Sequence, residues 1–283
     1  MDKNREKSHN FRKKPPARHL DPYGKREDTQ PKSEHQAVED DGRIEGRNAV
    51  LEALRAGVII DKVFIAKGDT DAALGHIAAI AREAGAVVVD ADRRKLDFMS
   101  TTRAHQGVIA MASAANYVSI SDIVDIAKQK GEDLLIILCE EISDPHNLGA
   151  IIRTCEAVGA HGVVITKHRS AGLSATVAKA SSGAVYHLPI ARVTNMTAAI
   201  TELKKSGVWI FGASADSETP MWQADFKGPI AIVIGSEGTG ISRLVGESCD
   251  FNINIPMYGK MGSLNASVSA AILMYEAARQ RNL

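Results

Sequence analysis

The second half of the chain consists of short apolar runs that alternate with segments of helical periodicity. We predict strands at 134–139, 162–166, 208–212, 230–234 and 251–255. We predict helices at 148–158, 173–182, 196–206, 240–246 and 264–280. Strands that are buried on both faces of a sheet read as continuous apolar runs. The pattern therefore predicts an α/β domain over 134–283, with a parallel sheet that helices cover on both faces.

A smaller region with the same alternation precedes this domain. We predict its strands at 62–66, 86–90 and 107–112. We predict its helices at 46–54, 71–84 and 93–99. These elements indicate a small α/β domain over 43–114, and the segment 115–133 is predicted to be a linker that contains a helix.

The first 42 residues are polar, with four prolines and almost no aliphatic side chains. Residues 1–20 hold seven Lys or Arg against two acidic residues, whereas residues 21–42 hold three basic residues against seven acidic ones. Such a segment buries too little apolar surface to offset the entropy lost on ordering, so we predict a disordered tail over 1–42. Its basic half is either a non-specific contact for RNA phosphates or a solvated extension.

Charge and cysteine content exclude several classes of protein. The chain has 34 Lys plus Arg and 34 Asp plus Glu, which excludes a uniformly basic nucleic-acid coat but not a local basic patch. Its apolar runs are far shorter than the roughly 20 residues of a membrane span, and the charged N-terminus lacks the apolar stretch of a secretory signal. Cys139, Cys155 and Cys249 lie far apart, which argues against a disulfide framework or a metal site. We expect a cytoplasmic protein with reduced cysteines.

The first motif spans residues 144–154, with the sequence DPHNLGAIIRT, between a predicted strand and a predicted helix. Asn147 lies at the expected helix start, where an N-cap is its simplest role. At 100° per residue, Arg153 lies about 140° from Leu148 and therefore off the apolar stripe of the helix. Arg153 is accordingly expected to point toward solvent or a cleft.

The second motif, residues 232–240, carries the predicted strand 230–234 into the glycine-rich turn Gly235-Ser236-Glu237-Gly238. Ligands of open α/β sheets bind just outside such strand ends, and glycine permits close approach of the backbone. The spacing fits neither a P-loop nor the dinucleotide-binding GxGxxG motif. A simple tight turn is the alternative interpretation.

The third motif, residues 255–268, joins the last predicted strand to the last helix. Ser263, Asn265 and Ser267 cluster at the start of that helix, where free N–H groups and hydroxyls either cap the helix or hold a polar ligand. The helix is predicted to pack through one apolar face that consists of Leu264, Val268, Ala271, Ile272 and Tyr275.

Together the three motifs resemble those of the SpoU/TrmH branch of the SPOUT RNA methyltransferases. The matching residues are Asn147 and Arg153, then Gly235, Glu237 and Gly238, and then 263–268. The resemblance covers 134–283 closely and 43–114 more loosely. In the latter region, 44–50 (IEGRNAV) and 105–107 (HQG) are similar to the L30e-like substrate-binding domain of members that modify rRNA. Within the family, the chain is most similar to the 23S rRNA guanosine 2′-O-methyltransferases.

The resemblance implies a fold, a cofactor and a set of site residues. The α/β domain would end in a deep trefoil knot whose loops hold S-adenosylmethionine, and the protein would be a homodimer that methylates a ribose 2′-hydroxyl of 23S rRNA. The cofactor would be held by Gly235, Ile255, Met257 and Leu264. The catalytic set would be Asn147, Arg153, Glu237, Ser263 and Asn265. Arg153 has the central role in this set, as a base or as a group that binds a nearby phosphate and orients the hydroxyl.

Two alternatives remain open within this interpretation. A tRNA substrate is the first, although the dedicated front domain favours rRNA by analogy. A non-catalytic protein of RNA binding or ribosome assembly is the second, and the intact motif residues argue against it. A nucleotide-dependent dehydrogenase is excluded because no GxGxxG motif opens the α/β domain.

Overall fold

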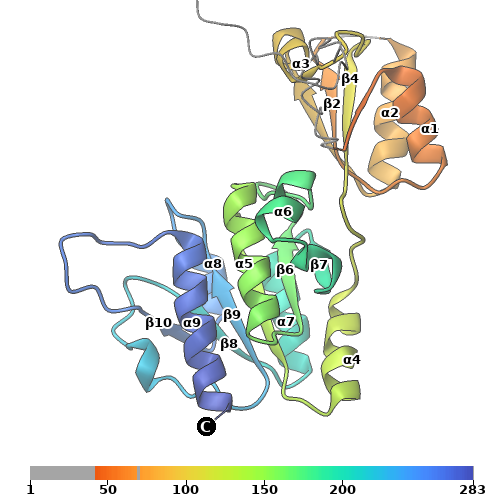
Figure 1. Cartoon of the computed structure of the whole chain (residues 1–283). Helices are drawn as coiled ribbons and strands as arrows, with labels where there is room; N and C mark the ends of the chain where they lie inside the picture. Colours follow the sequence, from red (N-terminus) through yellow and green to blue (C-terminus); the bar gives the residue numbers. More distant parts are fainter. Residues whose placement is uncertain (1–41, 69–70, 283) are drawn as a thin grey trace, which may run out of the picture. The chain divides into compact units, whose positions relative to one another are not determined.

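The computed structural model describes residues 42–68 and 71–282, so the predicted disordered tail lies outside the described residues except for Gly42. Figure 1 shows two β-sheets, each with its own helices. The domain boundaries predicted at 43–114, 115–133 and 134–283 stay predictions. Among the described helices, none is both long enough and apolar enough to cross a membrane.

The first sheet has four strands in the order β1-β4-β2-β3. Its strands are β1 (Arg43–Glu45), β2 (Ile60–Ala66), β3 (Val87–Ala91) and β4 (Val108–Ala112). Strand β4 is antiparallel to both β1 and β2, whereas β2 and β3 are parallel. Strand β1 was not predicted, because three residues with two charged side chains carry no strand pattern of their own.

Helices cover both faces of the first sheet. They are α1 (Arg47–Arg55), α2 (Ala72–Glu83) and α3 (Arg93–Met99). Helices α1 and α2 pack on one face around Val50, Leu74 and Ile77, and α3 packs on the other through Leu96. The α/β character of this region is as predicted, and α3 has the predicted bounds.

The second sheet has six strands, and every pairing in it is parallel. In the order β10-β8-β9-β5-β6-β7, they are β10 (Phe251–Ile253), β8 (Trp209–Ala213), β9 (Ile230–Ile234), β5 (Leu135–Cys139), β6 (Gly162–Thr166) and β7 (Ile190–Val193). The predicted parallel sheet is therefore confirmed. Strand β7 was not predicted, because its four residues include Arg192 and follow a proline, so they do not read as an apolar run.

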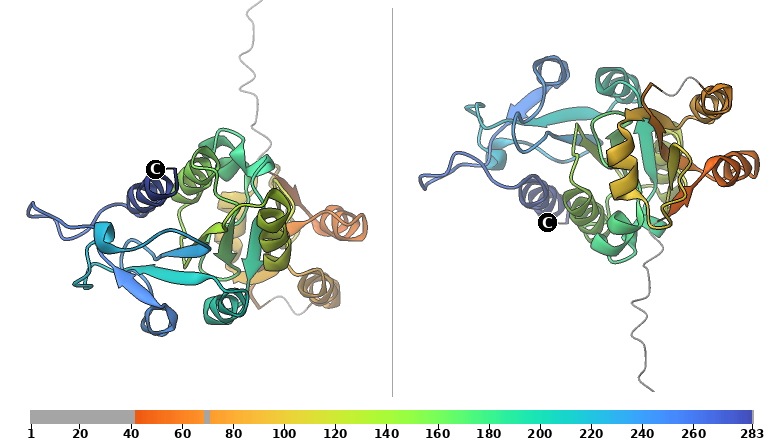
Figure 2. Two further views of the ribbon diagram at one scale, coloured as in Figure 1. Left: turned by 90° about the horizontal axis from the view of Figure 1, so that it is seen from below. Right: turned by 90° about the horizontal axis from the view of Figure 1, so that it is seen from above.

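Two helical layers enclose this sheet (Figure 2). One layer consists of α5 (Pro145–Ala157), α6 (Ala175–Ala180) and α9 (Ala266–Arg281). The other consists of α4 (Ile120–Lys130), α7 (Met196–Lys205) and α8 (Arg243–Ser248). Alternate residues of each strand face opposite layers, as Ile137 and Leu138 do, so the strands are buried on both faces. The helix predicted within the linker, α4, belongs to the core of this sheet.

The buried face of α9 differs from the predicted one. Its buried residues are Ala266, Ala270, Leu273, Met274 and Ala277. The predicted face is displaced from this one: Val268 is 45% exposed, Tyr275 is 57% exposed, and Leu264, Ala271 and Ile272 are half-buried. Alanines allow α9 to lie close to α5 and the sheet, while Val268 and Tyr275 remain uncovered in the single chain.

Helices α5 and α6 approach each other closely at Gly149. A Cβ atom at this position would lie 2.4 Å from the Ala180 Cβ atom and 3.0 Å from the Ser181 backbone nitrogen. Glycine is costly in a helix interior, so its presence in α5 is explained by this contact rather than by helix propensity.

We predict that Gly149→Ala destabilises the protein by about 1–3 kcal/mol, because the added methyl group overpacks the α5–α6 contact. The matched control is Gly75→Ala in α2, where the added Cβ atom would meet nothing within 4 Å. That control is expected to stabilise its domain by about 0.5–1 kcal/mol. Urea unfolding of both variants measures the difference, and equal effects of the same sign would contradict the close contact.

Candidate functional site

A cavity of about 330 Å³ lies at the carboxyl ends of β8, β9 and β10. The segments that follow these strands form its walls. All four residues predicted to hold a cofactor line it: Gly235, Ile255, Met257 and Leu264. The structure thus brings residues that are up to 29 positions apart in sequence to one cavity. Their role in binding stays a prediction.

The glycine-rich turn after β9 forms one wall of the cavity. The Ser236 nitrogen donates to the Gly240 carbonyl at 3.1 Å, and the Gly240 nitrogen donates back to Ser236 at 2.9 Å. This closure brings the chain back over Gly235, where a Cβ atom would lie 2.0 Å from the Gly240 carbonyl carbon. No side chain fits at residue 235 without displacement of the turn.

Three side chains from the three sequence motifs meet beside this turn. The Asn147 Nδ2 atom donates to the Glu237 carboxylate at 2.8 Å. The Asn265 Nδ2 atom donates to the same carboxylate oxygen, and to the Asn147 side-chain oxygen at 3.0 Å. We call Asn147, Glu237 and Asn265 the polar triad. Because these residues are separated by 90 and 28 positions, only the tertiary fold brings them together.

Asn147 is not the N-cap that its position in the sequence suggested. Asp144 caps α5 instead, since its Oδ1 atom accepts from the His146 nitrogen at 2.9 Å and Pro145 occupies the first helical position. Asn147 is therefore buried within the first turn, and its amide is available to Glu237.

Asn265 is the N-cap of α9 as well as a member of the polar triad. Its Oδ1 atom accepts from the Ser267 nitrogen at 2.9 Å, from the Val268 nitrogen at 3.3 Å and from the Ser267 hydroxyl at 2.6 Å. The amide oxygen accepts hydrogen bonds from the start of α9, and the amide nitrogen donates to Glu237. Capping, one of the two roles expected for this residue, is thus confirmed, and ligand binding by Asn265 stays a prediction.

The other two predicted catalytic residues lie outside the polar triad. Ser263 is exposed and lines the cavity. Arg153 is exposed on α5, as the helical angle predicted, but it does not line the cavity. Its guanidinium has no hydrogen bond or ion pair with any residue in the described ranges 42–68 and 71–282. A single chain therefore does not place Arg153 at its own cavity.

Three residues after β8 line the cavity although the sequence analysis did not select them: Ser214, Ala215 and Asp216. Polar residues directly after a predicted apolar strand were the signal that could have identified them, because strand ends of a parallel sheet share one edge.

The charge of the cavity has one sign. Asp216 and Glu237 contribute carboxylates, and the lining residues within the described part of the chain include no Lys, Arg or His. The described residues also contain no cluster of three or more His, Cys, Asp or Glu side chains able to hold a metal ion. The cavity is thus suited to a ligand that carries a positive centre and presents polar groups to main-chain atoms.

The fold and cavity define the class of protein: an α/β protein that binds a ligand in the loops at the carboxyl ends of its parallel strands. Residues 133–275 match the model of the SpoU rRNA Methylase family. Residues 43–118 match the model described as RNA 2′-O ribose methyltransferase substrate binding. The chain belongs to the SpoU rRNA methylase family and is an RNA methyltransferase of the SpoU/TrmH type, which confirms the family that the motifs indicated.

Similar proteins share most of the chain. YacO of Bacillus subtilis strain 168, whose name places it among TrmH family tRNA/rRNA methyltransferases, is 45% identical over 237 residues, which are 84% of this chain and 95% of YacO. A protein of Staphylococcus haemolyticus strain JCSC1435 with the same family name is 44% identical over 239 residues, or 84% and 96% of the two chains. The structure of an AdoMet-bound rRNA methyltransferase from Sinorhizobium meliloti has 25% identity and a TM-score of 0.53, and the match covers 84% of this chain and 87% of that one.

We predict that Asn265→Asp makes stability depend on pH. The cap is retained, but a second carboxylate faces Glu237, so the pKa of the pair rises in the folded state. A raised folded pKa means that stability is lost as pH rises. The expected loss at pH 7 is between about 1 and 4 kcal/mol, the energies of two unit charges 4 Å apart at high and intermediate dielectric constants.

Urea unfolding between pH 4 and pH 8 tests this prediction. Asn265→Ala is the control, because it removes the cap at a cost of about 1 kcal/mol without adding a charge. The double variant with Glu237→Gln is expected to restore most of the stability at high pH. Equal losses in Asn265→Asp with and without Glu237→Gln would show that the two side chains are not in contact.

Proposed function

We propose that the protein transfers a methyl group from S-adenosylmethionine to a ribose 2′-hydroxyl of RNA, at a guanosine of 23S rRNA. The observation that carries this proposal is the polar triad beside the cavity, which unites the three motifs of the family at one place. The front region supports an RNA substrate, since residues 43–118 match a substrate-binding model of RNA 2′-O ribose methyltransferases.

The cavity fits S-adenosylmethionine in shape and charge. The turn at Gly235 exposes main-chain groups to a ligand, and Ile255, Met257 and Leu264 offer apolar contacts for the faces of an adenine ring. The carboxylates of Asp216 and Glu237 favour a positively charged ligand. The similar rRNA methyltransferase from Sinorhizobium meliloti was solved with AdoMet bound. When bound, S-adenosylmethionine supplies a sulfonium methyl, which the ribose oxygen takes as the carbon–sulfur bond breaks and the hydroxyl proton leaves to solvent.

The residues of this chain have the task of orienting a weak nucleophile. The polar triad fixes the turn at Glu237 and the start of α9, so that the cavity wall does not rearrange during the reaction. A guanidinium stays protonated, so Arg153 acts by binding the phosphate beside the target ribose and by orienting the 2′-hydroxyl for in-line attack. Ser263 at the cavity rim adds a hydroxyl within the same region.

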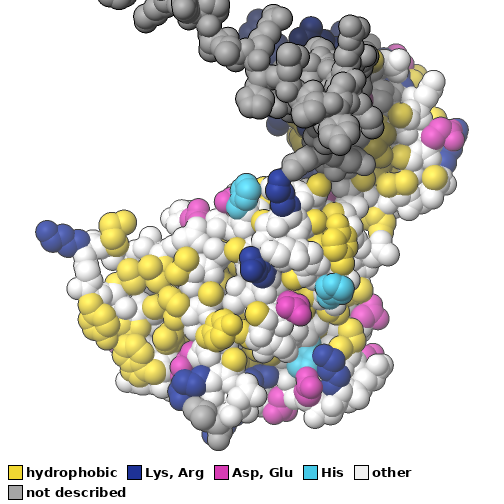
Figure 3. All heavy atoms as spheres, in the orientation of Figure 1, with side chains coloured by type: hydrophobic (Ala, Val, Ile, Leu, Met, Phe, Trp, Pro, Cys, Tyr) yellow, Lys and Arg dark blue, Asp and Glu magenta, His cyan; other side chains and the backbone are white. Residues whose placement is uncertain are grey.

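We infer that the active protein is a homodimer in which Arg153 of one subunit serves the cavity of the other. Arg153 does not line the cavity of its own chain, so we infer that a second chain completes the site. The uncovered side chains of α9 and the preceding loop provide a surface for it: Val268 and Tyr275 on the helix, and Met257, Tyr258 and Met261 on the loop. Figure 3 shows hydrophobic side chains gathered over this part of the molecule.

The remaining family features belong to the same proposal. The chain at the carboxyl end of the second sheet would form a trefoil knot, and the first sheet would be an L30e-like domain. A tRNA substrate is the second candidate, because YacO is named for both tRNA and rRNA. A cytoplasmic location also stays a prediction.

We predict that Arg153→Ala lowers methyl transfer about a hundredfold or more while S-adenosylmethionine binding is unchanged, because the residue orients the hydroxyl and does not line the cavity. The assay supplies labelled S-adenosylmethionine with unmodified 23S rRNA or tRNA transcripts. Arg243→Ala is the control, since Arg243 is an exposed arginine on α8 that pairs with Glu247.

Mixed dimers test whether Arg153 acts across the interface. An equal mixture of Arg153→Ala and Gly235→Ala chains forms dimers with one intact cavity facing one intact Arg153. Random pairing is expected to restore about a quarter of wild-type activity. Recovery of no activity, with both variants folded and dimeric, would place Arg153 at its own cavity.

We predict that Tyr275→Asp, which puts a charge on the uncovered face of α9, dissociates the dimer. Light scattering should give twice the 30.3 kDa chain mass for the wild type and the mass of one chain for the variant. Leu244→Asp, an equally exposed apolar position on α8, is the control that should remain dimeric. A wild-type mass of a single chain at micromolar concentration would contradict the homodimer.

A further inference from the structure

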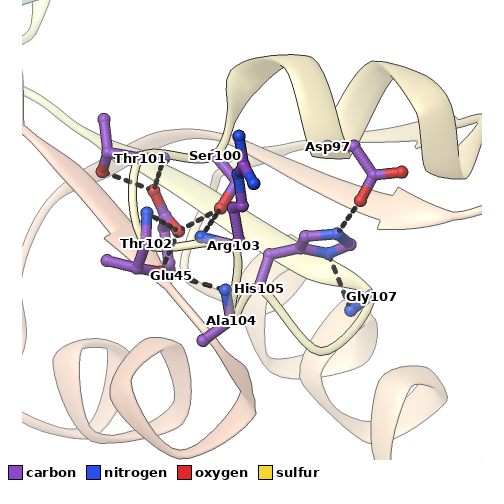
Figure 4. Close-up of polar contacts among 9 residues, drawn as sticks. All are labelled: Glu45, Asp97, Ser100, Thr101, Thr102, Arg103, Ala104, His105 and Gly107. Atoms are coloured by element: carbon purple, nitrogen blue, oxygen red, sulfur yellow. Dashed lines mark hydrogen bonds and ion pairs between the residues drawn. The ribbon is translucent and has the colours of Figure 1, made fainter.

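The two motifs of the front region, 44–50 and 105–107, lie against each other and hold the loop 100–106 (Figure 4). The Glu45 carboxylate accepts hydrogen bonds from the Ser100 hydroxyl at 2.6 Å, from the Thr101 nitrogen at 2.7 Å and from the Thr101 hydroxyl at 2.9 Å. The nitrogen and hydroxyl of Thr102 donate to it as well. Burial opposes ionisation, but these donors outweigh it and lower the pKa of Glu45 to about 2. Glu45 is thus a fixed anion that serves the loop.

A histidine fastens the other end of the loop. The His105 Nδ1 atom accepts from the Gly107 nitrogen at 3.0 Å, so Nε2 carries the proton of the neutral ring and donates to Asp97 of α3 at 3.0 Å. Arg47 adds two contacts to Gln106, from its backbone nitrogen at 3.1 Å and from its Nε atom at 3.0 Å. The loop is therefore attached to β1, α1 and α3.

This attachment maintains a backbone that would otherwise be unfavourable. Arg103 has a φ of 57° and Gln106 a φ of 51°, both in the left-handed region that non-glycine residues seldom adopt. The Arg103 nitrogen donates to the Ser100 hydroxyl at 2.8 Å, and that hydroxyl in turn donates to Glu45. These hydrogen bonds offset the free-energy cost of a backbone conformation that leaves the Arg103 side chain in solvent. Strained backbone of this kind is typical of functional loops.

An aromatic ring and a second arginine lie on the adjacent helix. Phe98 of α3 is 91% exposed, whereas Leu96, two residues earlier and on the opposite face of the helix, is fully buried. Arg94 is four residues before Phe98, so the two side chains share the outward face of the helix. Segment 92–106 carries four Lys or Arg and two Asp, and one of these, Asp97, is engaged by His105. The surface is basic around an exposed ring.

We propose that α3 and the loop 100–106 form a contact surface for unpaired RNA nucleotides. Phe98 stacks on a base, Arg94 and Arg103 bind phosphates, and Glu45 is the positioning residue that holds Arg103 in place. An isolated ring stacks only on a base whose face is open, which a duplex does not offer. This inference rests on the proposed function in one respect, namely that the substrate is RNA.

Binding of the full-length protein to a fluorescent single-stranded 20-mer of uridine, and to the same strand paired with oligoadenylate, tests the proposal. The wild type is expected to prefer the single strand. Phe98→Ala should weaken single-strand binding roughly tenfold, the typical effect of losing one stacked base. Arg103→Ala should reduce the slope of log affinity against log salt by about one. The matched control is Arg82→Ala, because Arg82 is an exposed arginine on α2, which packs on the same sheet. This control should change neither the single-strand affinity nor the salt dependence.

Glu45→Gln tests the positioning role. It is expected to weaken single-strand binding about fivefold in the wild-type background and less than twofold in the Arg103→Ala background, because Glu45 acts through Arg103. A merely structural effect of Glu45 would be the same in both backgrounds. Equal effects in both would overturn the role assigned to Glu45.

Two outcomes overturn the contact surface itself: single-strand affinities of Phe98→Ala and Arg103→Ala within twofold of the wild type, or a wild-type preference for the duplex. Methyl transfer to 23S rRNA and tRNA transcripts is measured in parallel. A wild type that binds the single strand through Phe98 but methylates neither RNA would overturn the proposed function and leave this inference standing. If the enzyme is active and its KM for RNA is unchanged in Phe98→Ala and Arg103→Ala, the contact surface is overturned and the proposed function stands.

Discussion

The Glu237 carboxylate connects the three segments that surround the candidate site: the turn after β9, the start of α5 and the start of α9. Glu237 accepts hydrogen bonds from the amides of Asn147 and Asn265, and these come from the first turn of α5 and the N-cap of α9. A carboxylate accepts hydrogen bonds from neutral donors more strongly than a neutral acceptor does. The turn after β9 and the two helices are therefore mutually constrained. The shape of the cavity at Gly235 depends on this arrangement, as does any chemistry carried out there.

Much of the fold was predictable from local pattern. The runs at β6 and β9 are continuous and largely apolar, β9 lies between Pro229 and Gly235, and both strands have the predicted bounds. Strands β1 and β7 were not predictable in this way, because Arg43 and Arg192 interrupt them and they exist through pairing with distant strands. Helical periodicity likewise found α9 but not its buried face. Alanines at 266, 270 and 277 are selected for close packing, which a scale of hydrophobicity does not detect.

Several members of the candidate site were predictable from the sequence, but the cavity residues after β8 and the geometry of the site were not. The motifs identified the polar triad and the four predicted cofactor residues, and the structure brings each group together. The spacing of the motifs did not reveal which residue caps each helix and which residue contacts Glu237. Asp144, not Asn147, caps α5, and Asn265 caps α9 with one amide atom while it binds Glu237 with the other. Only the tertiary structure reveals that Arg153 does not line the cavity, and the proposed catalytic role of this residue therefore depends on how the protein assembles.

The place of Asn265 has a thermodynamic consequence. The same helix begins at the cavity wall and carries the uncovered apolar residues Val268 and Tyr275. A ligand that orders the start of α9 lowers the entropy that association must still remove, and association in turn orders the cavity wall for the ligand. In the proposed homodimer, cofactor occupancy and self-association would then be linked by reciprocal free energies of coupling. The two subunits of that homodimer would therefore respond to cofactor supply through the capped start of α9.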